Sequence, residues 1–415
     1  MERKRILFIL GTRPEAIKLC PLVLWMKTFV DRYAVRVCVT AQHRQMLDQV
    51  LSVFAVVPDH DLNLMVPGQT LFESTSRILA GLEPVLSKER PDLVIVQGDT
   101  TTTLCGALAA FYQHVPIAHI EAGLRTGDPQ QPFPEELNRS LAGRMATWHF
   151  AATEGAAQNL LREGILPARI KVTGNTGIDA LLHVEQGLTS GRYEQTRFPA
   201  LSGRKLIVVT AHRRESFGRG FEQICRALVQ IAQRNDAQIV FPVHPNPNVQ
   251  APVRQHLASQ PHISLIDPLG YVPFVDLMRQ AYLLLTDSGG IQEEAPSLGK
   301  PVLVLRDKTE RPEAVTAGTV RLVGTNASRI VSEATLLLES KREYASMTRR
   351  HNPYGDGHAC QRIEETLRAF FGFGPLPERA AQPLGPVWRT AASIVRTLRS
   401  QEASMKNQEG ENDGG

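Results

Sequence analysis

The sequence contains no long apolar segment. None of its runs approaches the roughly 18 consecutive apolar residues that indicate a membrane span. The run near the basic N-terminus, Ile6–Leu10, is too short for the hydrophobic region of a signal peptide. We therefore expect Ile6–Leu10 to form a first buried strand, and we expect no membrane association.

Cysteines are few, and common metal and nucleotide signatures are missing. The five cysteines form no CxxC pair, which indicates reduced core thiols of a cytoplasmic protein rather than a disulfide framework or a zinc site. No HxxxH or HExxH pattern supplies metal ligands. Neither GxGxxG nor a Walker A loop is present, which disfavours nicotinamide and ATP. We expect neither a metal nor a cofactor.

An excess of one charge is also missing. The formal net charge is +4 and no run of Lys and Arg forms a dedicated patch, so nothing supports nucleic-acid binding. The composition is that of an ordinary globular protein, 42% hydrophobic and 21% charged. A chain of 415 residues exceeds the roughly 250–300 that one hydrophobic core serves, so we expect two domains.

Short apolar runs alternate with longer helical patterns, which is typical of parallel α/β structure. The first series of predicted strands is Ile6–Leu10, Val35–Thr40, Leu93–Gln97, Ile117–Ile120 and His149–Ala151. The second series is Leu206–Thr210, Ile239–Pro242, Ser264–Ile266, Leu283–Thr286 and Val302–Leu305. Two Rossmann-like, doubly wound sheets follow, with a ligand expected in the cleft between the domains.

The predicted boundaries place residues 1–175 in the first domain, completed by a C-terminal helix at 354–372, and residues 176–353 in the second. Residues 373–415 are rich in Pro, Gly, Gln and Glu, which predicts a mostly disordered tail. Within the tail, Val387–Leu398 can place apolar residues on one helix face. That pattern fits a loosely docked appendage, or alternatively a membrane-bound or partner-bound helix.

Two strand-to-helix loops are candidate anion sites. The loop that starts at Gly11 follows the first strand directly, and Arg13 and Lys18 add positive charge to the start of the next helix. The alternative is a plain turn with solvated charges. In the second domain, Ser288, Gly289 and Gly290 follow a strand and precede a helix that we expect to begin at Ile291.

In that second loop, Glu293 and Glu294 would lie in the first helical turn, where Glu294 is suited to ribose hydroxyls. Arg306 and Arg311 follow the next strand and could close over a diphosphate. Two anion sites on two domains fit one nucleotide diphosphate better than either loop does alone.

Carboxylates gather at the predicted strand ends of the first domain. Asp99 and Glu121 follow neighbouring strands and should converge at one sheet edge. Glu135 and Glu136 stand at a predicted helix start, where helix-terminal charge is the alternative explanation. A cluster of carboxylates in a cleft has raised pKa values, which suits proton transfer.

Two histidines follow strands of the second domain. His212 comes after Leu206–Thr210 and His244 after Ile239–Pro242. A position at a strand end facing the cleft favours a catalytic or phosphate-binding role for His212, and His244 is a weaker candidate of the same kind.

In order and spacing, the segments GTRPEAIK, TAQHRQMLDQVL, GDTTTTL, EAGLRTGD, PFPEE, HRRESFGRGF, TDSGGIQEEAPSLGKPV and TERPEAVTAGT resemble those of the non-hydrolysing UDP-N-acetylglucosamine 2-epimerases of bacteria. The resemblance runs from about Arg5 to Phe371. It implies a glycosyltransferase-B-like fold, usually as a homodimer. It also implies reversible conversion of UDP-GlcNAc to UDP-ManNAc for cell-surface polysaccharide biosynthesis, by anti elimination of UDP to 2-acetamidoglucal and re-addition.

By match of motif, the resemblance also implies residue roles. The catalytic group would be Asp99, Glu121, Glu135 and His212. The substrate and UDP contacts would be Arg13, Lys18, Phe274, Ser288, Gly289, Gly290, Glu294 and Arg311. A second UDP-GlcNAc, acting as an allosteric activator, would contact Gln42, Gln45, Glu136, Arg213 and His244. Leu269 stands where the family often has Gln, so that uracil-side contact differs.

Three rival functions share these features. A glycosyltransferase of the same fold would need an acceptor site, and a UDP-sugar sensor or scaffold would not need the carboxylates. A hydrolysing epimerase would release free ManNAc. The carboxylate set at Asp99, Glu121 and Glu135 favours proton chemistry on the sugar.

Overall fold

The computed structural model describes residues 2–40, 44–64, 66, 68–198, 203–349 and 351–374, without the side chains of Arg44 and Gln45. The predicted tail therefore lies almost wholly outside the described residues, as does its segment Val387–Leu398. The chain divides into two compact units. The first is Met1–His183 together with the segment that begins at His358, and the second is Val184–Gly357.

The first unit is built on a seven-stranded parallel sheet with the order β3-β2-β1-β4-β5-β6-β7. Its strands are β1 (Lys4–Leu10), β2 (Tyr33–Val39), β3 (His60–Asp61), β4 (Leu93–Gln97), β5 (Ile117–Ile120), β6 (Trp148–Ala151) and β7 (Ile170–Val172). The central strands are mainly apolar because helices cover both faces. The strand order reverses between β1 and β4, which makes the loops after these two strands the natural ligand position.

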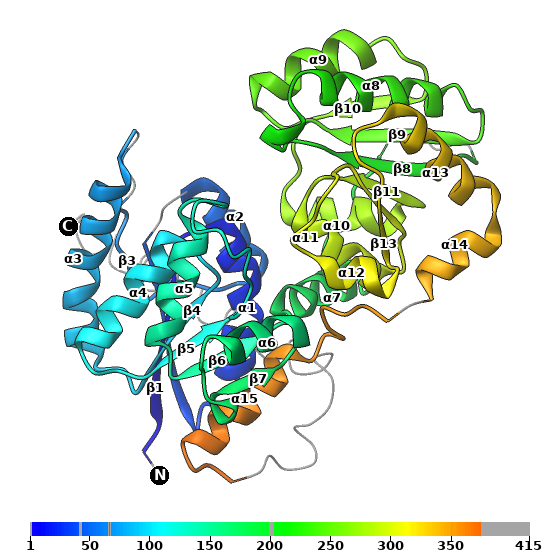
Figure 1. Cartoon of the computed structure of the whole chain (residues 1–415). Coiled ribbons are helices and arrows are strands. Elements are labelled where there is room, and N and C mark those ends of the chain that lie inside the picture. The colour runs from blue at the N-terminus through cyan, green and yellow to red at the C-terminus, as the bar shows by residue number, and fades with distance from the viewer. Residues whose placement is uncertain are drawn as a thin grey trace, which may run out of the picture. The chain divides into compact units, whose positions relative to one another are not determined.

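Helices flank this sheet on both sides. They are α1 (Arg13–Lys27), α2 (Arg44–Val53), α3 (Leu71–Glu89), α4 (Thr101–Tyr112), α5 (Glu135–Met145), α6 (Glu154–Arg162) and α15 (Ala359–Phe370). A further helix, α7 (Thr176–Thr189), begins in the first unit and ends in the second. The helices α3, α4 and α5 lie side by side, and α1 packs against α2 and α15 (Figure 1). Asp179 of α7 accepts hydrogen bonds from the amides of Ala359 and Cys360, at 3.2 and 2.9 Å, and so caps α15.

The second unit repeats the design with a six-stranded parallel sheet, in the order β10-β9-β8-β11-β12-β13. Its strands are β8 (Lys205–Thr210), β9 (Ala237–Pro242), β10 (Ile263–Ile266), β11 (Leu283–Thr286), β12 (Val302–Val304) and β13 (Val320–Leu322). Its helices are α8 (Arg219–Ala232), α9 (Pro247–Leu257), α10 (Tyr271–Gln280), α11 (Gly289–Glu294), α12 (Pro312–Ala317), α13 (Ala327–Glu339) and α14 (Lys341–Thr348). Here the order reverses between β8 and β11.

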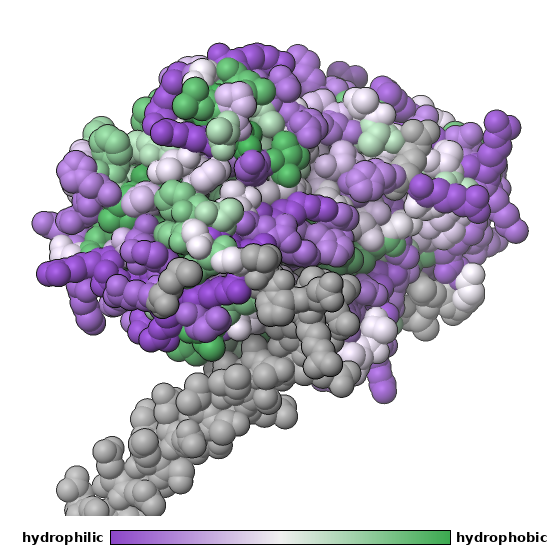
Figure 2. All heavy atoms as spheres, turned by 90° about the horizontal axis from the view of Figure 1, so that it is seen from below, coloured by the Kyte–Doolittle hydropathy of each residue, from purple (hydrophilic) through white to green (hydrophobic). Residues whose placement is uncertain are grey.

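The predicted doubly wound α/β class is confirmed, and three predicted strands have the bounds that the structure gives: Leu93–Gln97, Ile117–Ile120 and Leu283–Thr286. Three edge strands were not predicted. They are β3, β7 and β13, which are two or three residues long and carry no apolar run. Among the described residues, no helix combines the length and hydropathy needed to cross a bilayer. The face shown in Figure 2 intersperses apolar with hydrophilic residues.

Candidate active site

The loop between β1 and α1 is organised by a buried carboxylate that the sequence reasoning missed. Glu15 is 1% exposed, and its Oε2 accepts hydrogen bonds from the amides of Gly11 and Thr12, at 3.1 and 2.8 Å, and from Thr12 Oγ1, at 2.7 Å. Thr12 is the N-cap of α1, so the pair forms a capping box. Only glycine fits at position 11, where a Cβ would lie 2.2 Å from Thr102 Oγ1. The spacing Thr12-x-x-Glu15 is the signal that could have identified this carboxylate.

Glu15 also joins this loop to the one after β4. Its Oε1 accepts hydrogen bonds from Thr100 Oγ1 and Thr103 Oγ1, at 2.8 and 3.2 Å. Burial raises the pKa of Glu15, although the donating hydroxyls and amides oppose the rise. One side chain therefore fixes the two loops at the point where the strand order of the first sheet reverses.

Glu121 follows β5 and lies at the centre of a polar cluster. Its φ is +62°, a backbone region that non-glycine residues seldom adopt and that concentrates at functional sites. Its carboxylate accepts hydrogen bonds from Lys18 Nζ, from Gln97 Nε2, and from Asn175 Nδ2 at 2.9 Å. The predicted phosphate-binding lysine is thus paired with a predicted catalytic carboxylate. Gln97 and Asn175 were not predicted.

Asp99 follows β4 and faces the same region. Arg139 of α5 donates to Asp99 Oδ2, and Asn138 Nδ2 donates to the Asp99 carbonyl at 2.9 Å. Burial raises the pKa of Asp99; Arg139 opposes that rise, while Glu121 and Glu135 add to it. Glu121 and Glu135 therefore both lie within electrostatic reach of Asp99. The strand-end argument predicts this for Asp99 and Glu121.

The two glutamates at the start of α5 differ in their surroundings. Glu135 Oε2 is buried and has no hydrogen-bond partner among the described residues. Glu136 is 4% exposed, and its Oε1 accepts the amides of Thr126 and Gly127, both at 3.0 Å. Its Oε2 lies 3.3 Å from Arg139 Nη1. Glu136 therefore holds the loop after β5, whereas one oxygen of Glu135 is buried without a hydrogen-bond partner among the described residues.

In the second unit, the loops after β8 and β11 meet at the reversal point. His212 Nδ1 lies 3.3 Å from Oδ1 of Asp287, which is fully buried. The rings of His212 and His244 stack with centroids 5.2 Å apart and an interplanar angle of 14°. The structure thus brings together the two predicted histidines and adds an aspartate that was not predicted to contribute.

The loop at Ser288 differs from the prediction in one respect. α11 begins at Gly289, two residues before the predicted start, so Glu293 and Glu294 lie at its end and not in its first turn. The predicted placement was wrong because Gly289 and Gly290 are already helical. A Cβ at Gly289 would lie 2.9 Å from Arg311 Cζ, so a larger residue there would displace the Arg311 side chain.

The predicted diphosphate-binding arginines are held by acidic partners. Arg311 pairs with Glu293 and Glu310, at 2.8 and 2.9 Å, and Arg306 pairs with Glu215 and Glu310, at 2.5 and 2.7 Å. Burial opposes ionisation of Glu310, but Arg311 and Arg306 hold its pKa down, at about 2. Both guanidinium groups are therefore positioned before any anion arrives.

The remaining predicted contacts are dispersed. Arg13 is half-buried at the start of α1, and Phe274 is half-buried on α10. The Arg213 side chain is 41% exposed and lies 3.8 Å from Glu310. Gln42 and the side chain of Gln45 lie outside the described residues.

Comparison with known proteins identifies the family. The model of the family described as UDP-N-acetylglucosamine 2-epimerase matches residues 30–368. A UDP-N-acetylglucosamine 2-epimerase of Escherichia coli (strain K12) is 59% identical over 372 residues, which cover 88% of this chain and 98% of that protein. The chain belongs to the UDP-N-acetylglucosamine 2-epimerase family.

Solved structures of this epimerase family match the fold closely. The crystal structure of the UDP-GlcNAc 2-epimerase from Neisseria meningitidis, bound to UDP-GlcNAc, has a TM-score of 0.82 and 48% identity, and the match covers 88% of this chain and 100% of that one. The enzyme from Methanocaldococcus jannaschii, in complex with UDP-GlcNAc and UDP, has a TM-score of 0.72 and 35% identity, with 88% and 99% covered. These matches confirm the expected family, the isomerase assignment and the glycosyltransferase-B-like fold.

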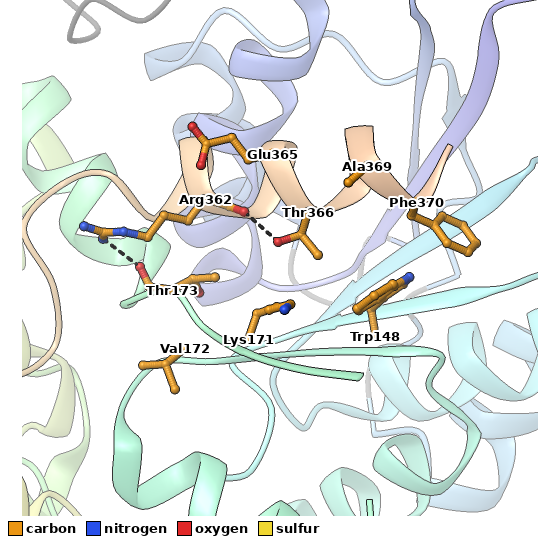
Figure 3. Close-up of a pocket in the computed structure, with 9 residues that line it drawn as sticks. All are labelled: Trp148, Lys171, Val172, Thr173, Arg362, Glu365, Thr366, Ala369 and Phe370. Carbon is orange, nitrogen blue, oxygen red and sulfur yellow. Dashed lines mark hydrogen bonds between the residues drawn. The ribbon is translucent and has the colours of Figure 1, made fainter. Parts of the chain in front are cut away.

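A cavity of about 550 Å³ lies in the first unit (Figure 3). Trp148 and Phe370 stand at one end of it, with their rings edge to face at 5.8 Å. At the other end, Arg362 Nη1 donates to the Thr173 carbonyl at 3.1 Å. None of the predicted site residues lines this cavity.

Proposed function

We propose that the chain interconverts UDP-GlcNAc and UDP-ManNAc by elimination and re-addition of UDP. A base removes the C2 proton, the electron pair forms the C1–C2 double bond, and the anomeric C–O bond breaks with its pair leaving on UDP. The resulting 2-acetamidoglucal then takes UDP back at C1 and a proton on the opposite face of C2. The observation that carries the proposal is the placement of Asp99 and Glu121 after the paired strands β4 and β5, with Glu135 at the start of α5, the helix whose Arg139 donates to Asp99.

The surroundings of the three carboxylates favour a division of work. Asp99 has a raised pKa, and Glu135 has a buried oxygen with no hydrogen-bond partner among the described residues. A raised pKa suits a group that exchanges a proton near neutral pH, and we assign that role to Asp99. Donors from three side chains occupy both oxygens of Glu121, which suits a group that orients its neighbours and Lys18.

Departure of UDP requires stabilisation of charge on the diphosphate. We assign this to Arg13 and Lys18 of the first unit and to Arg311 of the second, with His212 exchanging a proton or a hydrogen bond with the leaving group. The pairs of Arg311 with Glu293 and Glu310 support this role, because positioned cations need little reorganisation when charge develops. Ser288, Gly290 and Glu294 would hold the nucleotide, and Phe274 would pack near it.

The test is turnover in deuterium oxide with UDP-GlcNAc, followed by NMR and mass spectrometry. UDP-ManNAc should form, and deuterium should enter C2 of both the product and the recovered substrate, because the carboxylates exchange with solvent. Quenched reactions should also contain small amounts of UDP and 2-acetamidoglucal. Epimerisation that keeps the original hydrogen at C2, or release of free ManNAc, would contradict the mechanism.

We also propose that the chain is a cytoplasmic homodimer. All five cysteines are buried free thiols, which fits a reducing compartment. On α5, Leu137 and Leu141 are 46% and 43% exposed and lie one turn apart, beside α4. An exposed apolar stripe of this kind fits a self-complementary interface.

The dimer is tested by light scattering after gel filtration. The double variant Leu137→Asp with Leu141→Asp should be monomeric. A matched control, Leu336→Asp, changes a leucine of α13 that is 39% exposed and should leave the dimer intact. If the double variant and the control were both dimeric, the interface would not include Leu137 and Leu141.

A further inference from the structure

Asp287 has no part in the functional assignment above, yet it is the most deeply buried acid near His212. β8 and β11 pair so that Thr286 lies opposite Thr210. The residues directly after each strand therefore meet. Asp287 is 0% exposed, and a carboxylate is retained at such a depth only where specific partners compensate for its burial.

The described partners of the Asp287 carboxylate belong to the His212 loop. Its Oδ2 accepts hydrogen bonds from the amides of His212 and Arg213, both at 2.7 Å. Its Oδ1 is buried, has no hydrogen-bond partner among the described residues, and lies 3.3 Å from His212 Nδ1. One oxygen therefore fixes the backbone that carries the histidine, and the other oxygen faces the ring.

The contact determines which ring nitrogen reacts. A carboxylate oxygen facing Nδ1 favours the hydrogen on Nδ1, so that Nε2 is left as the acceptor in the neutral ring. The neighbouring ring has the opposite arrangement: His244 Nδ1 accepts the amide hydrogen of Asn246 at 3.2 Å, which places the hydrogen on Nε2. The two stacked imidazoles thus offer one acceptor and one donor.

We infer that Asp287 is the positioning residue of His212, holding its ring in the tautomer with Nδ1 protonated so that Nε2 meets the departing UDP. The inference rests on the proposed function of His212 and adds to it the group that makes the histidine competent. It predicts that the charge of Asp287, and not only its shape, is required.

The groups that face His212 are Asp287, Arg213 and His244. Burial lowers the pKa of His212, Asp287 opposes this, and Arg213 and His244 add to the lowering. Loss of the Asp287 charge should therefore lower the pKa of His212 further. The limb of the pH–rate profile that reports this histidine should move to lower pH in Asp287→Asn, whether His212 acts as acid or as base.

The decisive variant is Asp287→Asn. Its amide oxygen can still accept the two backbone amides, while its NH₂ group faces Nδ1 and imposes the other tautomer. We expect kcat to fall by about 10²–10⁴-fold, the scale seen when a histidine is held in the wrong tautomer, with the Kd for UDP within about threefold of wild type. Nitrogen-15 NMR of histidine-labelled protein should show the His212 hydrogen moving from Nδ1 to Nε2.

A matched control separates positioning from structure. Asp276 is also 0% exposed in the second unit, accepts the Thr196 amide at 2.7 Å and pairs with Arg279 at 3.0 Å. Asp276→Asn should lower the melting temperature without moving the His212 tautomer or the pH limb. In a double-mutant cycle with His212→Asn, Asp287→Asn should cost little further activity, because both act through one ring.

The inference would be overturned if the His212 tautomer were unchanged in Asp287→Asn and the activity losses in the double-mutant cycle were additive. Asp287 would then have only a structural role. The nitrogen-15 signal needs no turnover, so it tests the positioning of His212 even if the wild-type protein produced no UDP-ManNAc. Absence of that product would refute the proposed function alone.

Discussion

Replacement of Glu15 should reveal how strongly one buried carboxylate holds the first half of the site. In Glu15→Ala, the amides of Gly11 and Thr12 lose their acceptor, at about 1–3 kcal/mol for each buried donor. The cavity adds a few kcal/mol. The sum, roughly 4–8 kcal/mol, approaches the 5–15 kcal/mol that typically separates a folded from an unfolded domain.

Glu15→Gln should be far milder. Its amide oxygen can accept the three donors now on Oε2, and its NH₂ group can donate to the hydroxyls of Thr100 and Thr103. The loss of charge-assisted hydrogen bonds is offset because the neutral amide has no charge to bury. We expect the free energy of unfolding of Glu15→Gln to be about 1–2 kcal/mol below that of wild type at pH 7.

The pH dependence has a defined sign. Burial raises the pKa of Glu15 above its value in the unfolded chain. The native state therefore binds the proton more tightly, and the stabilisation from Glu15 is greatest at low pH and is lost as pH rises through the folded pKa. The penalty of Glu15→Gln relative to wild type should be larger at pH 5 than at pH 8.

The assay is urea unfolding followed by tryptophan fluorescence. Trp25 and Trp148 both lie in the first unit, and the third tryptophan, Trp388, lies outside the described residues. The signal therefore reports the unit that contains Glu15. The control is Glu73, which forms the same capping box with Thr70 on α3 but is exposed. If Glu15→Ala destabilised no more than Glu73→Ala, or if the Gln penalty grew with pH, the reasoning would be refuted.

Three further outcomes are expected. Asp99→Asn and Glu135→Gln should each lower kcat by roughly 10²-fold or more with less effect on UDP binding by calorimetry, and an equal loss of UDP affinity would assign them to nucleotide binding. Turnover should persist in EDTA because cationic side chains neutralise the diphosphate; loss that a divalent ion restores would contradict this. UDP-ManNAc alone should epimerise slowly and accelerate when a little UDP-GlcNAc is added, whereas hyperbolic rates without activation would exclude a second, allosteric site.

Prediction from the sequence succeeded for segments whose own composition indicates whether they are buried. β4 and β5 are short, mainly apolar runs between polar loops, so their bounds could be read directly. β7 is partly exposed at a sheet edge and carries a lysine, so its sequence does not differ from that of a loop. Edge strands gain their structure from a neighbour, and that neighbour is not visible locally.

The site residues were likewise predictable where local sequence sufficed and not where contacts between distant segments decide their positions. Asp99 and Glu121 were predictable because parallel strands end at a common edge. Their partners were not, because Lys18 and Asn175 approach Glu121 from positions 103 and 54 residues away in the chain. The role of Asp287 depends likewise on β11 lying beside β8, which is a fact of topology and not of spacing.

The division of the chain also orders its synthesis. The second unit, Val184–Gly357, is inserted between two parts of the first, and α15 packs against α1. During translation the whole second unit leaves the ribosome before α15 does. At typical elongation rates, the first sheet must wait on the order of tens of seconds for the helix that covers it.

When α15 docks on the first unit, Asp179 caps its N-terminus. Asp179 accepts the amides of Ala359 and Cys360, and it is buried, with a pKa that burial raises to about 6. Until those amides arrive, this acid and the apolar surface of α1 are open to solvent and to chaperones. Chains truncated before His358 and released from the ribosome should therefore contain a folded second unit and an unfinished first one.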